Sequence, residues 1–249
     1  MEIQQMGLDE LSSYQILSSG FESTIYIKDN IAIKKYYAID SNKMEKIKLL
    51  NKLNLPFLTN PEKLIEIDGK IDSFSMQFKR GYYPIGNSRD LPVVKKIELL
   101  KQLLNIINEL HKNNIIYGDL NPKNIICNGD TVYLTDVVNI KIGKYPFDEI
   151  SSTMKNYFNR GGTEESLDYY MFNLLTLYFL NEIEYQDLLS TIETTLIDHF
   201  NNNNDKNIIG LTDNLDCMNI GYQMLNPTQQ IDLLIDYIDP EIYKNKTKN

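Results

Sequence analysis

The first third of the chain alternates apolar and polar positions, a pattern typical of half-buried β-strands. Residues 14–36 alternate on both sides of a break at residues 28–30, so they predict a β-hairpin. Residues 64–67 and 73–78 alternate in the same way around Asp68-Gly69, a pair that is common in tight hairpin turns. The pattern therefore predicts two hairpins in this part of the chain.

Between the two hairpins, apolar residues recur at helical spacing over residues 41–54. Ser41 and Asn42 are the candidate N-cap residues, because their side chains can accept a hydrogen bond from the first turn. With a further strand that ends near Leu17, we expect about five strands and one helix before Tyr83.

Beyond Pro92 the helical period dominates. Residues 93–113 place apolar side chains at regular three- and four-residue steps and predict a long helix. Two short strand-like segments follow at residues 125–127 and 132–135, on either side of an Asn-Gly-Asp turn. Further helices are expected at residues 147–159, 166–180, 184–200 and 228–237.

A β-rich first third followed by a mainly helical remainder favours an α+β fold with two lobes. We expect residues 1–83 to form a small antiparallel β lobe with one helix. Residues 84–249 are expected to form a larger, mainly helical lobe.

Composition narrows the classes of function. The 249-residue chain is 42% hydrophobic and carries a formal net charge of −9, which argues against a duplex nucleic-acid surface. The two cysteines, Cys127 and Cys217, and the two histidines are all far apart, so their spacing indicates neither a disulfide pair nor a zinc site. We therefore expect a reduced cytoplasmic protein. The acidic start has no apolar signal core, and the most apolar run, Met171–Leu180, is too short to span a bilayer. We therefore expect neither a nucleic-acid nor a membrane partner.

The residues that suggest chemistry lie in a short strip of the chain. Asp119 and Asn124 stand five positions apart on a predicted loop, and Asp136 follows at the end of the next predicted hairpin. Phosphoryl transfer needs a carboxylate that faces the acceptor hydroxyl, together with oxygen ligands for Mg²⁺. Gly118-Asp119 or Asn121-Pro122 alone would indicate only an ordinary turn. Their joint spacing favours a site in which Asn124 and Asp136 bind the metal.

The segment Tyr117-Gly-Asp-Leu-Asn-Pro-Lys-Asn124 followed by Asp136 resembles the catalytic loop and metal-binding strand of protein kinases. The resemblance implies an ATP- and Mg²⁺-dependent enzyme in which Asp119 is the catalytic base and Asn124 and Asp136 are the metal ligands. The expected enzyme is a divergent Ser/Thr protein kinase of bacterial or phage origin, acting on a protein hydroxyl. Two alternatives are a small-molecule kinase of the aminoglycoside or choline phosphotransferase type and a non-catalytic pseudokinase module.

The segment Leu17–Tyr26 resembles the glycine-rich turn of the same family. Gly20 is the one glycine retained, and Ser18 and Ser23 stand at the other two glycine positions. A turn of small residues can still bring backbone N–H groups close to phosphates. The resemblance therefore implies that Ser18, Gly20 and Ser23 lie near the nucleotide.

Ile31-Ala-Ile-Lys34 matches the family strand whose lysine binds the α- and β-phosphates. The resemblance also implies an acidic partner for Lys34 on the following helix. Glu45 is the only acidic residue between Asp40 and Glu62, so it is the expected partner. The alternative is a surface pair between Glu45 and Lys48, three residues further along the helix.

Two further positions follow from the resemblance. Met76 would border the adenine, and the backbone groups of Gln77, Phe78 and Lys79 would hold the base. Met76 and Phe78 are equally suited to be core residues of an edge strand. Asp168 resembles a buried aspartate that hydrogen-bonds the backbone of the catalytic loop. Its alternative is an ordinary acidic residue at a helix start.

The chain also departs from the family pattern. Tyr117-Gly118 replaces His-Arg, Val137-Val138 replaces Phe-Gly, and Asn121 stands where the family has lysine. No Ala-Pro-Glu sequence lies between Asp136 and Asp168. These differences predict an unusual acceptor side and regulation that does not use the family's phosphorylation switch.

Overall fold

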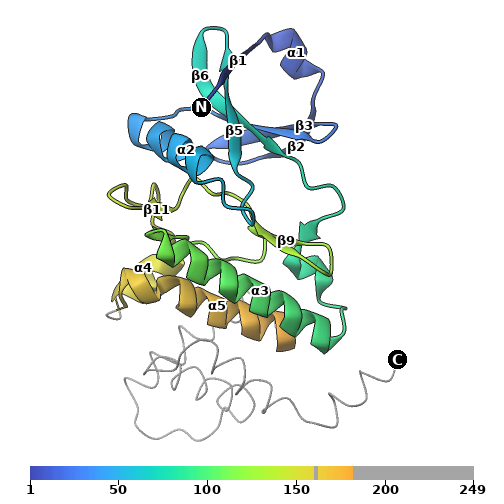
Figure 1. The fold of residues 1–249 in the computed structure, drawn as a ribbon, viewed down its shortest axis with the longest axis vertical. Coiled ribbons are helices and arrows are strands. Elements are labelled where there is room, and N and C mark those ends of the chain that lie inside the picture. Colours follow the sequence, from blue (N-terminus) through green and yellow to red (C-terminus); the bar gives the residue numbers. More distant parts are fainter. Residues whose placement is uncertain (160–161, 182–249) are drawn as a thin grey trace, which may run out of the picture. The chain divides into compact units, whose positions relative to one another are not determined.

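The computed structural model describes residues 1–159 and 162–181, which form two compact units (Figure 1). The first unit joins residues 1–82 with residues 133–149. The second unit joins residues 83–132 with the described residues from 150 onward. Both strands and helices occur in the chain, so its described part has mixed α and β content.

The first unit is built on a six-stranded sheet in the order β1-β5-β6-β4-β3-β2. Both hairpins predicted from the alternating pattern are formed, by β3 with β4 and by β5 with β6. β1 was not predicted, and it pairs in parallel with β5. The strand bounds are Ile3–Met6 (β1), Gln15–Ser19 (β2), Ser23–Lys28 (β3), Ile31–Tyr36 (β4), Pro61–Ile67 (β5) and Lys70–Gln77 (β6).

The hairpin turns follow from their residue types. Asp68 and Gly69 have φ angles of 49° and 75°, and two consecutive positive φ values are what a tight two-residue hairpin turn requires. Asp29, between β3 and β4, has a φ of 54°. Aspartate tolerates this left-handed region better than most residues, so both turns match their sequence.

Helix α2 (Ser41–Leu53) packs against β5, and a shorter helix, α1 (Leu8–Ser12), was not predicted. The N-cap expected at Ser41 or Asn42 is wrong, because the Asp40 side chain accepts the hydrogen bond from the Lys43 backbone N–H at 2.7 Å. The core beneath the helix contains Tyr36, Ile47, Leu64, Phe74 and Val138.

Residues 133–149 belong to the first unit, whereas the sequence pattern placed everything beyond residue 83 in a second lobe. The physical reason lies in β10 (Val132–Leu134), which crosses the boundary between the units. The Leu134 N–H donates to the Phe57 carbonyl, and the Leu134 carbonyl accepts from the Thr59 N–H, both at 3.0 Å. These bonds hold the segment that leads to Asp136 within the first unit.

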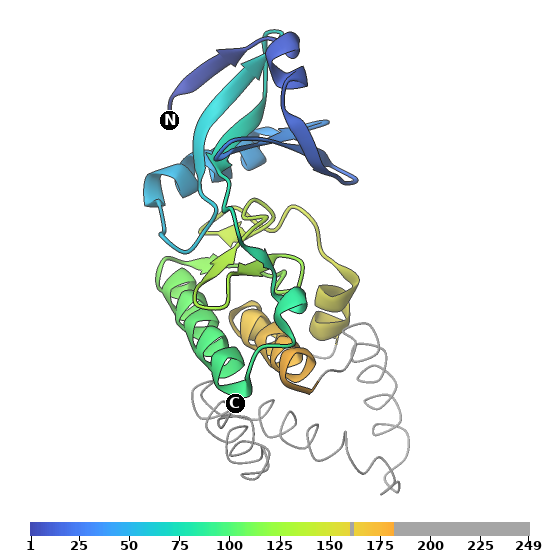
Figure 2. The ribbon, with the colours of Figure 1, turned by 90° about the vertical axis from the view of Figure 1, so that its right-hand side faces the viewer.

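The second unit contains the two longest described helices, α3 and α5, which lie side by side (Figure 2). The long helix predicted at 93–113 is confirmed, whereas the expected helix at 147–159 begins only at residue 152. The helices expected at 184–200 and 228–237 lie outside the described residues. The bounds are Tyr83–Pro84 (β7), Ile85–Ser88 (a 3₁₀ turn, η1), Val93–Lys112 (α3), Ile115–Ile116 (β8), Ile125–Cys127 (β9), Ser152–Asn159 (α4) and Glu164–Asn181 (α5). Within the part of the chain that the structure describes, no helix combines the length and the apolar character needed to cross a membrane.

Candidate functional site

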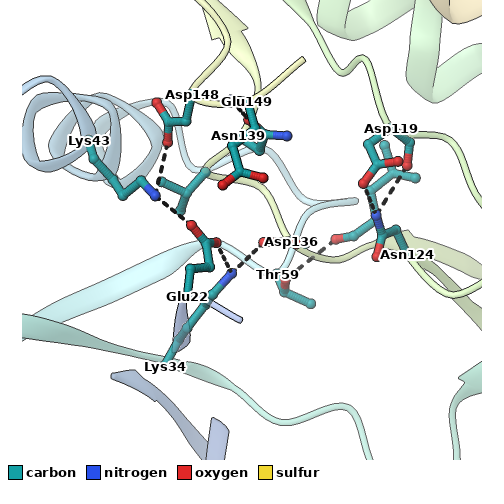
Figure 3. A network of polar contacts seen from close by, with 12 residues as sticks. Glu22, Lys34, Lys43, Thr59, Asp119, Asn124, Asp136, Asn139, Asp148 and Glu149 are labelled. Atoms are coloured by element: carbon teal, nitrogen blue, oxygen red, sulfur yellow. Dashed lines mark hydrogen bonds and ion pairs between the residues drawn. The ribbon is translucent and has the colours of Figure 1, made fainter. Parts of the chain in front are cut away.

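Lys34 lies at a central position of the first unit's sheet. It is on β4, where it pairs in register with Ile25 of β3 and Phe74 of β6. Its side chain is 6% exposed, and its ammonium group forms ion pairs with Asp136 and, at 3.6 Å, with Glu22 (Figure 3). Because a buried ammonium group is costly without a partner, these two carboxylates stabilise its position.

The expected ion pair between Lys34 and Glu45 is not formed. The Glu45 carboxylate instead accepts from Lys48 at 2.8 Å, and both side chains are half exposed. This is the surface pair that the sequence offered as the alternative. The reason is the phase of α2, because Lys43 and Lys46 lie on its buried side and Glu45 does not.

Glu22, in the turn between β2 and β3, takes the place that was expected for Glu45. One oxygen of its carboxylate faces Lys34, and the other accepts from Lys43 at 2.7 Å. The Asp148 carboxylate in turn pairs with Lys43 at 3.4 Å and with the fully buried Lys46 at 2.5 Å. We call this set the lysine–carboxylate cluster. It contains Glu22, Lys34, Lys43, Lys46, Asp136 and Asp148.

An aromatic ring lies beneath two lysines of the cluster. The ammonium groups of Lys34 and Lys43 stand 5.1 Å and 4.8 Å from the centre of the Tyr36 ring, at cation–π distance. The Tyr36 hydroxyl is buried and has no hydrogen-bond partner among the described residues. Burial, followed by the negative charge of Asp136 and of the cluster's other carboxylates, raises the pKa of Tyr36 well above its ordinary value.

The charge of Lys43 is stabilised by the same cluster. Burial alone would lower the pKa of Lys43. The hydrogen bond to Glu22 and the charges of Glu22 and Asp148 outweigh burial, so the pKa is raised. Lys43 was not among the residues singled out from the sequence, because nothing in the local pattern distinguishes it from the other lysines of its helix.

Asp136 lies two residues after β10 and has a left-handed backbone, at a φ of 52°. Its side chain is 38% exposed, whereas Val137 and Val138, which replace Phe-Gly, are buried. The two valines anchor the chain directly after Asp136. The carboxylate therefore stands at a fixed position, with one oxygen bound to Lys34.

In the second unit, the loop of residues 117–124, here called the Asp119 loop, holds its carboxylate with two side-chain amides. The Asn121 amide donates to one carboxylate oxygen of Asp119 at 2.8 Å. The Asn124 amide donates to the other at 2.6 Å (Figure 3). Donors on both oxygens restrict rotation of the short side chain.

Asn121 organises the same loop. Its side-chain oxygen accepts from the backbone N–H groups of Lys123 at 2.9 Å and Asn124 at 3.2 Å. The sequence singles Asn121 out only as a replacement for the family's lysine. The signal that could have indicated its role is the Asn-Pro dipeptide, because asparagine side chains often bond the backbone two residues further along a turn.

The Asp119 loop is attached to α5 through Asp168. The fully buried carboxylate accepts from the backbone N–H of Gly118 at 2.7 Å and of Tyr117 at 2.8 Å. Its second oxygen also lies 2.9 Å from the ring nitrogen of His111, at the end of α3. The prediction that Asp168 bonds this loop is confirmed. The helix-start alternative fails, since α5 begins four residues earlier.

The turn between β2 and β3, which resembles the family's glycine-rich turn, is closed by a backbone hydrogen bond. The Gly20 N–H donates to the Ser23 carbonyl at 2.9 Å, and Ser18 pairs with Ile25 after a bulge in the β2–β3 ladder. Ser18 is exposed and Ser23 is buried. That these residues lie near a nucleotide stays a prediction.

The residues expected to border the adenine lie at the end of β6. Met76 pairs with Ala32 of β4 and Pro61 of β5 and packs against the core beneath α2, so it is a core residue as the alternative expected, but of an inner strand and not of an edge strand. Gln77 is exposed, and the Phe78 N–H donates to the Asn30 carbonyl at 2.8 Å. The contact of Met76, Gln77 and Phe78 with a base stays a prediction.

The two expected metal ligands belong to different units, Asn124 to the second and Asp136 to the first. Their joint binding of Mg²⁺ therefore stays a prediction, although an amide oxygen and a partly exposed carboxylate are suitable donors for this ion. Within residues 1–159 and 162–181, no group of three or more His, Cys, Asp or Glu side chains is arranged as a metal site.

Comparison with known proteins gives one partial similarity and no family assignment. No family model matches the chain. The chain is 30% identical over 121 residues to a protein of Acanthamoeba polyphaga mimivirus named "Putative serine/threonine-protein kinase R436". The match covers 43% of this chain and 42% of that protein, so the chain spans less than half the length of its relative. The similarity suggests a kinase-like relationship.

Proposed function

We propose that the protein is an ATP- and Mg²⁺-dependent phosphotransferase whose two units are the lobes of a protein-kinase-like fold. In the more specific form of the proposal it is a Ser/Thr protein kinase that transfers the γ-phosphoryl group to a protein hydroxyl. The observation that carries the proposal is the Asp119 loop, in which two amides hold a carboxylate and a buried Asp168 holds the backbone. The mimivirus relative supports the same class.

In this proposal Asp119 is the catalytic base. The acceptor oxygen attacks the γ-phosphorus, the bond to the oxygen that bridges the β- and γ-phosphates breaks, and ADP leaves. The proton of the acceptor hydroxyl passes to the Asp119 carboxylate. The amides of Asn121 and Asn124 fix that carboxylate before the acceptor arrives. Fixed orientation is a large part of catalysis in phosphoryl transfer.

On the nucleotide side, Lys34 would bind the α- and β-phosphates. Asn124 and Asp136 would hold Mg²⁺, which neutralises the charge that develops on the phosphate oxygens. The buried Val137 and Val138 hold the backbone next to Asp136, which supports this role because Asp136 does not have to become ordered when the nucleotide binds.

A second candidate is a nucleotide-binding module without transfer. One observation favours it, since Lys34 is already bound by Asp136 and Glu22. A protein of this kind would bind the nucleotide but transfer no phosphoryl group to an acceptor.

Transfer of ³²P from γ-labelled ATP to casein, to choline and to an aminoglycoside, each with and without Mg²⁺, tests the proposal. We expect Asp119→Asn to reduce transfer by about 10²–10⁴-fold, the usual contribution of a general base. Asp90→Asn is the matched control, because Asp90 is an exposed aspartate of the same unit, and it should leave transfer unchanged.

The outcomes separate the candidates. Undiminished transfer by Asp119→Asn would rule out the role of Asp119. Nucleotide binding without any label in casein, choline or an aminoglycoside would favour the non-catalytic module. Label in the small acceptors alone would replace the protein acceptor with a small-molecule hydroxyl.

A further inference from the structure

The Glu22 carboxylate bridges two buried lysines. Its two oxygens lie 3.6 Å from the Lys34 ammonium and 2.7 Å from the Lys43 ammonium (Figure 3). The lysine side chains are 6% and 11% exposed, whereas Glu22 is 34% exposed. A single anionic group therefore stands on the outer side of two cations that the protein keeps largely buried.

The two lysines are held by regular structure. Lys34 is paired on both sides of its strand, and the backbone of Lys43 is fixed by the N-cap Asp40. The Tyr36 ring lies beneath both ammonium groups. The backbone positions of the two lysines therefore do not depend on Glu22.

Glu22 is placed differently. It lies in a turn beside Phe21, whose side chain is 98% exposed. The turn backbone is closed by the bond from the Gly20 N–H to the Ser23 carbonyl and by the bond from the Tyr37 N–H to the Glu22 carbonyl. Neither bond involves the Glu22 side chain, so the carboxylate can leave the lysines by rotation about its own bonds.

The remaining charges favour an incoming anion. Without Glu22, Lys34 keeps Asp136, and Lys43 keeps Asp148, which Lys46 also binds. Each ammonium group then has donors for further oxygens, since an ammonium group carries three. A diphosphate or triphosphate brings more oxygens and more negative charge than a carboxylate, and it can bind both lysines at once.

We infer that Lys34 and Lys43 form a two-lysine site for the polyphosphate of a nucleotide, and that Glu22 is a built-in competitor for this site. The inference rests on the proposed function, to which it adds a second phosphate-binding residue and an internal inhibitor. In the alternative role, Glu22 remains bound to Lys34 and positions its ammonium group, as the kinase resemblance implies for a glutamate on the following helix. The two roles predict effects of opposite sign.

Binding of ATP and of inorganic tripolyphosphate, measured by isothermal titration calorimetry at fixed ionic strength, tests the inference. If Glu22 competes, Glu22→Gln tightens binding of both ligands by about tenfold. Lys43→Met and Lys34→Met each weaken binding by about tenfold or more, and Lys43→Arg retains much of it. Tripolyphosphate separates the phosphate site from any contact with the base.

Two matched controls isolate the site from general charge effects. Glu2→Gln makes the same charge change at an exposed acid directly before β1, one that pairs only with the surface residue Lys63 among the described residues. Lys48→Met makes the same change as Lys43→Met on the exposed face of α2. Both controls should bind ATP within twofold of the wild type.

Each contrary outcome has a definite meaning. If the wild type binds ATP and Glu22→Gln binds it equally well or more weakly, the inference is overturned and the proposed function still stands. Binding that needs Lys34 but not Lys43 overturns the two-lysine site. If neither ligand binds the wild type or Glu22→Gln, both the inference and the proposed function fail. If Lys43→Met does not fold, Glu22→Gln still decides, because its expected effect is a gain.

Discussion

The two groups of candidate residues are held in place by different interactions. In the lysine–carboxylate cluster, long side chains meet through charge, and a carboxylate such as Glu22 bridges two partners. In the Asp119 loop, short side chains are fixed by amide and backbone hydrogen bonds, and Asp168 accepts two backbone N–H groups. Ion pairs of flexible lysines can change partners at little geometric cost, whereas a short side chain with directional donors cannot. The first arrangement suits exchange of a ligand, and the second suits a fixed catalytic group.

The largest expected effect would break the fixed side of this comparison. Asp168→Ala leaves two buried backbone N–H groups without acceptors, and each such group costs about 1–3 kcal/mol. We expect the free energy of unfolding in urea to fall by about 4 kcal/mol. Asp90→Ala, at an exposed aspartate of the same unit, should change it by less than about 0.5 kcal/mol. A loss below about 1 kcal/mol in Asp168→Ala would mean that the loop does not depend on this attachment.

Lys46→Met tests the deepest ion pair of the cluster. The Lys46 ammonium is fully buried against Asp148, and methionine fills a similar volume without the charge. Because Asp148 keeps only the longer contact to Lys43, we expect a loss of about 3 kcal/mol in the free energy of unfolding. Lys48→Met on the same helix should be close to neutral. In a double-mutant cycle with Asp148→Asn, the two losses should not be additive, and additivity would show that the pair contributes nothing.

Asn121→Ala separates positioning from stability. Asn128 offers a matched control, because its side chain accepts from the N–H groups of Asp130 and Thr131 in a similar turn but is not bonded to Asp119. Both alanine variants should lower the free energy of unfolding by about 1 kcal/mol. In addition, Asn121→Ala should slow phosphoryl transfer by about tenfold, since it removes one amide from Asp119. Equal transfer rates in the two variants would contradict a positioning role for Asn121.

Tyr36→Phe gives the smallest expected effect and a pH dependence. Its hydroxyl is buried without a partner among the described residues, so removing it should stabilise the protein by about 1 kcal/mol. The pKa of Tyr36 is raised above 10.0 in the folded state, so unfolded tyrosine loses its proton first as the pH rises. The corresponding stability is present below about pH 10 and is lost as the pH rises toward the folded-state pKa.

Urea unfolding from pH 8 to 11 measures this effect. Stability of the wild type should fall above about pH 10, and Tyr36→Phe should reduce the slope. The raised pKa of Lys43 acts with the same sign at higher pH, so some slope should remain in the variant. If the free energy of unfolding falls with pH as steeply in Tyr36→Phe as in the wild type, other groups cause the loss of stability at alkaline pH.

Much of the local structure could be predicted from the sequence. The alternation of residues 14–36 and the turn at Asp68-Gly69 gave both hairpins, and the periodicity of residues 93–113 gave α3. Asp168 was also found in advance, through its resemblance to a known loop partner, and its bonds to Tyr117 and Gly118 agree with that prediction. In each case the signal lies within a few residues or in a motif of fixed spacing.

The partner of Lys34 could not be found in this way. Glu45 was the only acidic residue in the expected helix, but the phase of α2 turns it toward Lys48. Glu22 and Lys43 are 21 positions apart, and Asp148 lies more than a hundred residues further along the chain. They meet because the sheet, α2 and the segment 133–149 belong to one unit. Nothing in their local sequence distinguishes them from surface charges.

The sequence by itself determined the two hairpins, the long helix and the residue types of the Asp119 loop, because side-chain periodicity and turn chemistry act over short distances along the chain. Only the tertiary structure decided which charges meet. An ion pair depends on where two distant segments lie, and the preference of one lysine for one carboxylate leaves no periodic trace in the sequence. The exchange of Glu45 for Glu22 as the partner of Lys34 is the clearest result of that difference.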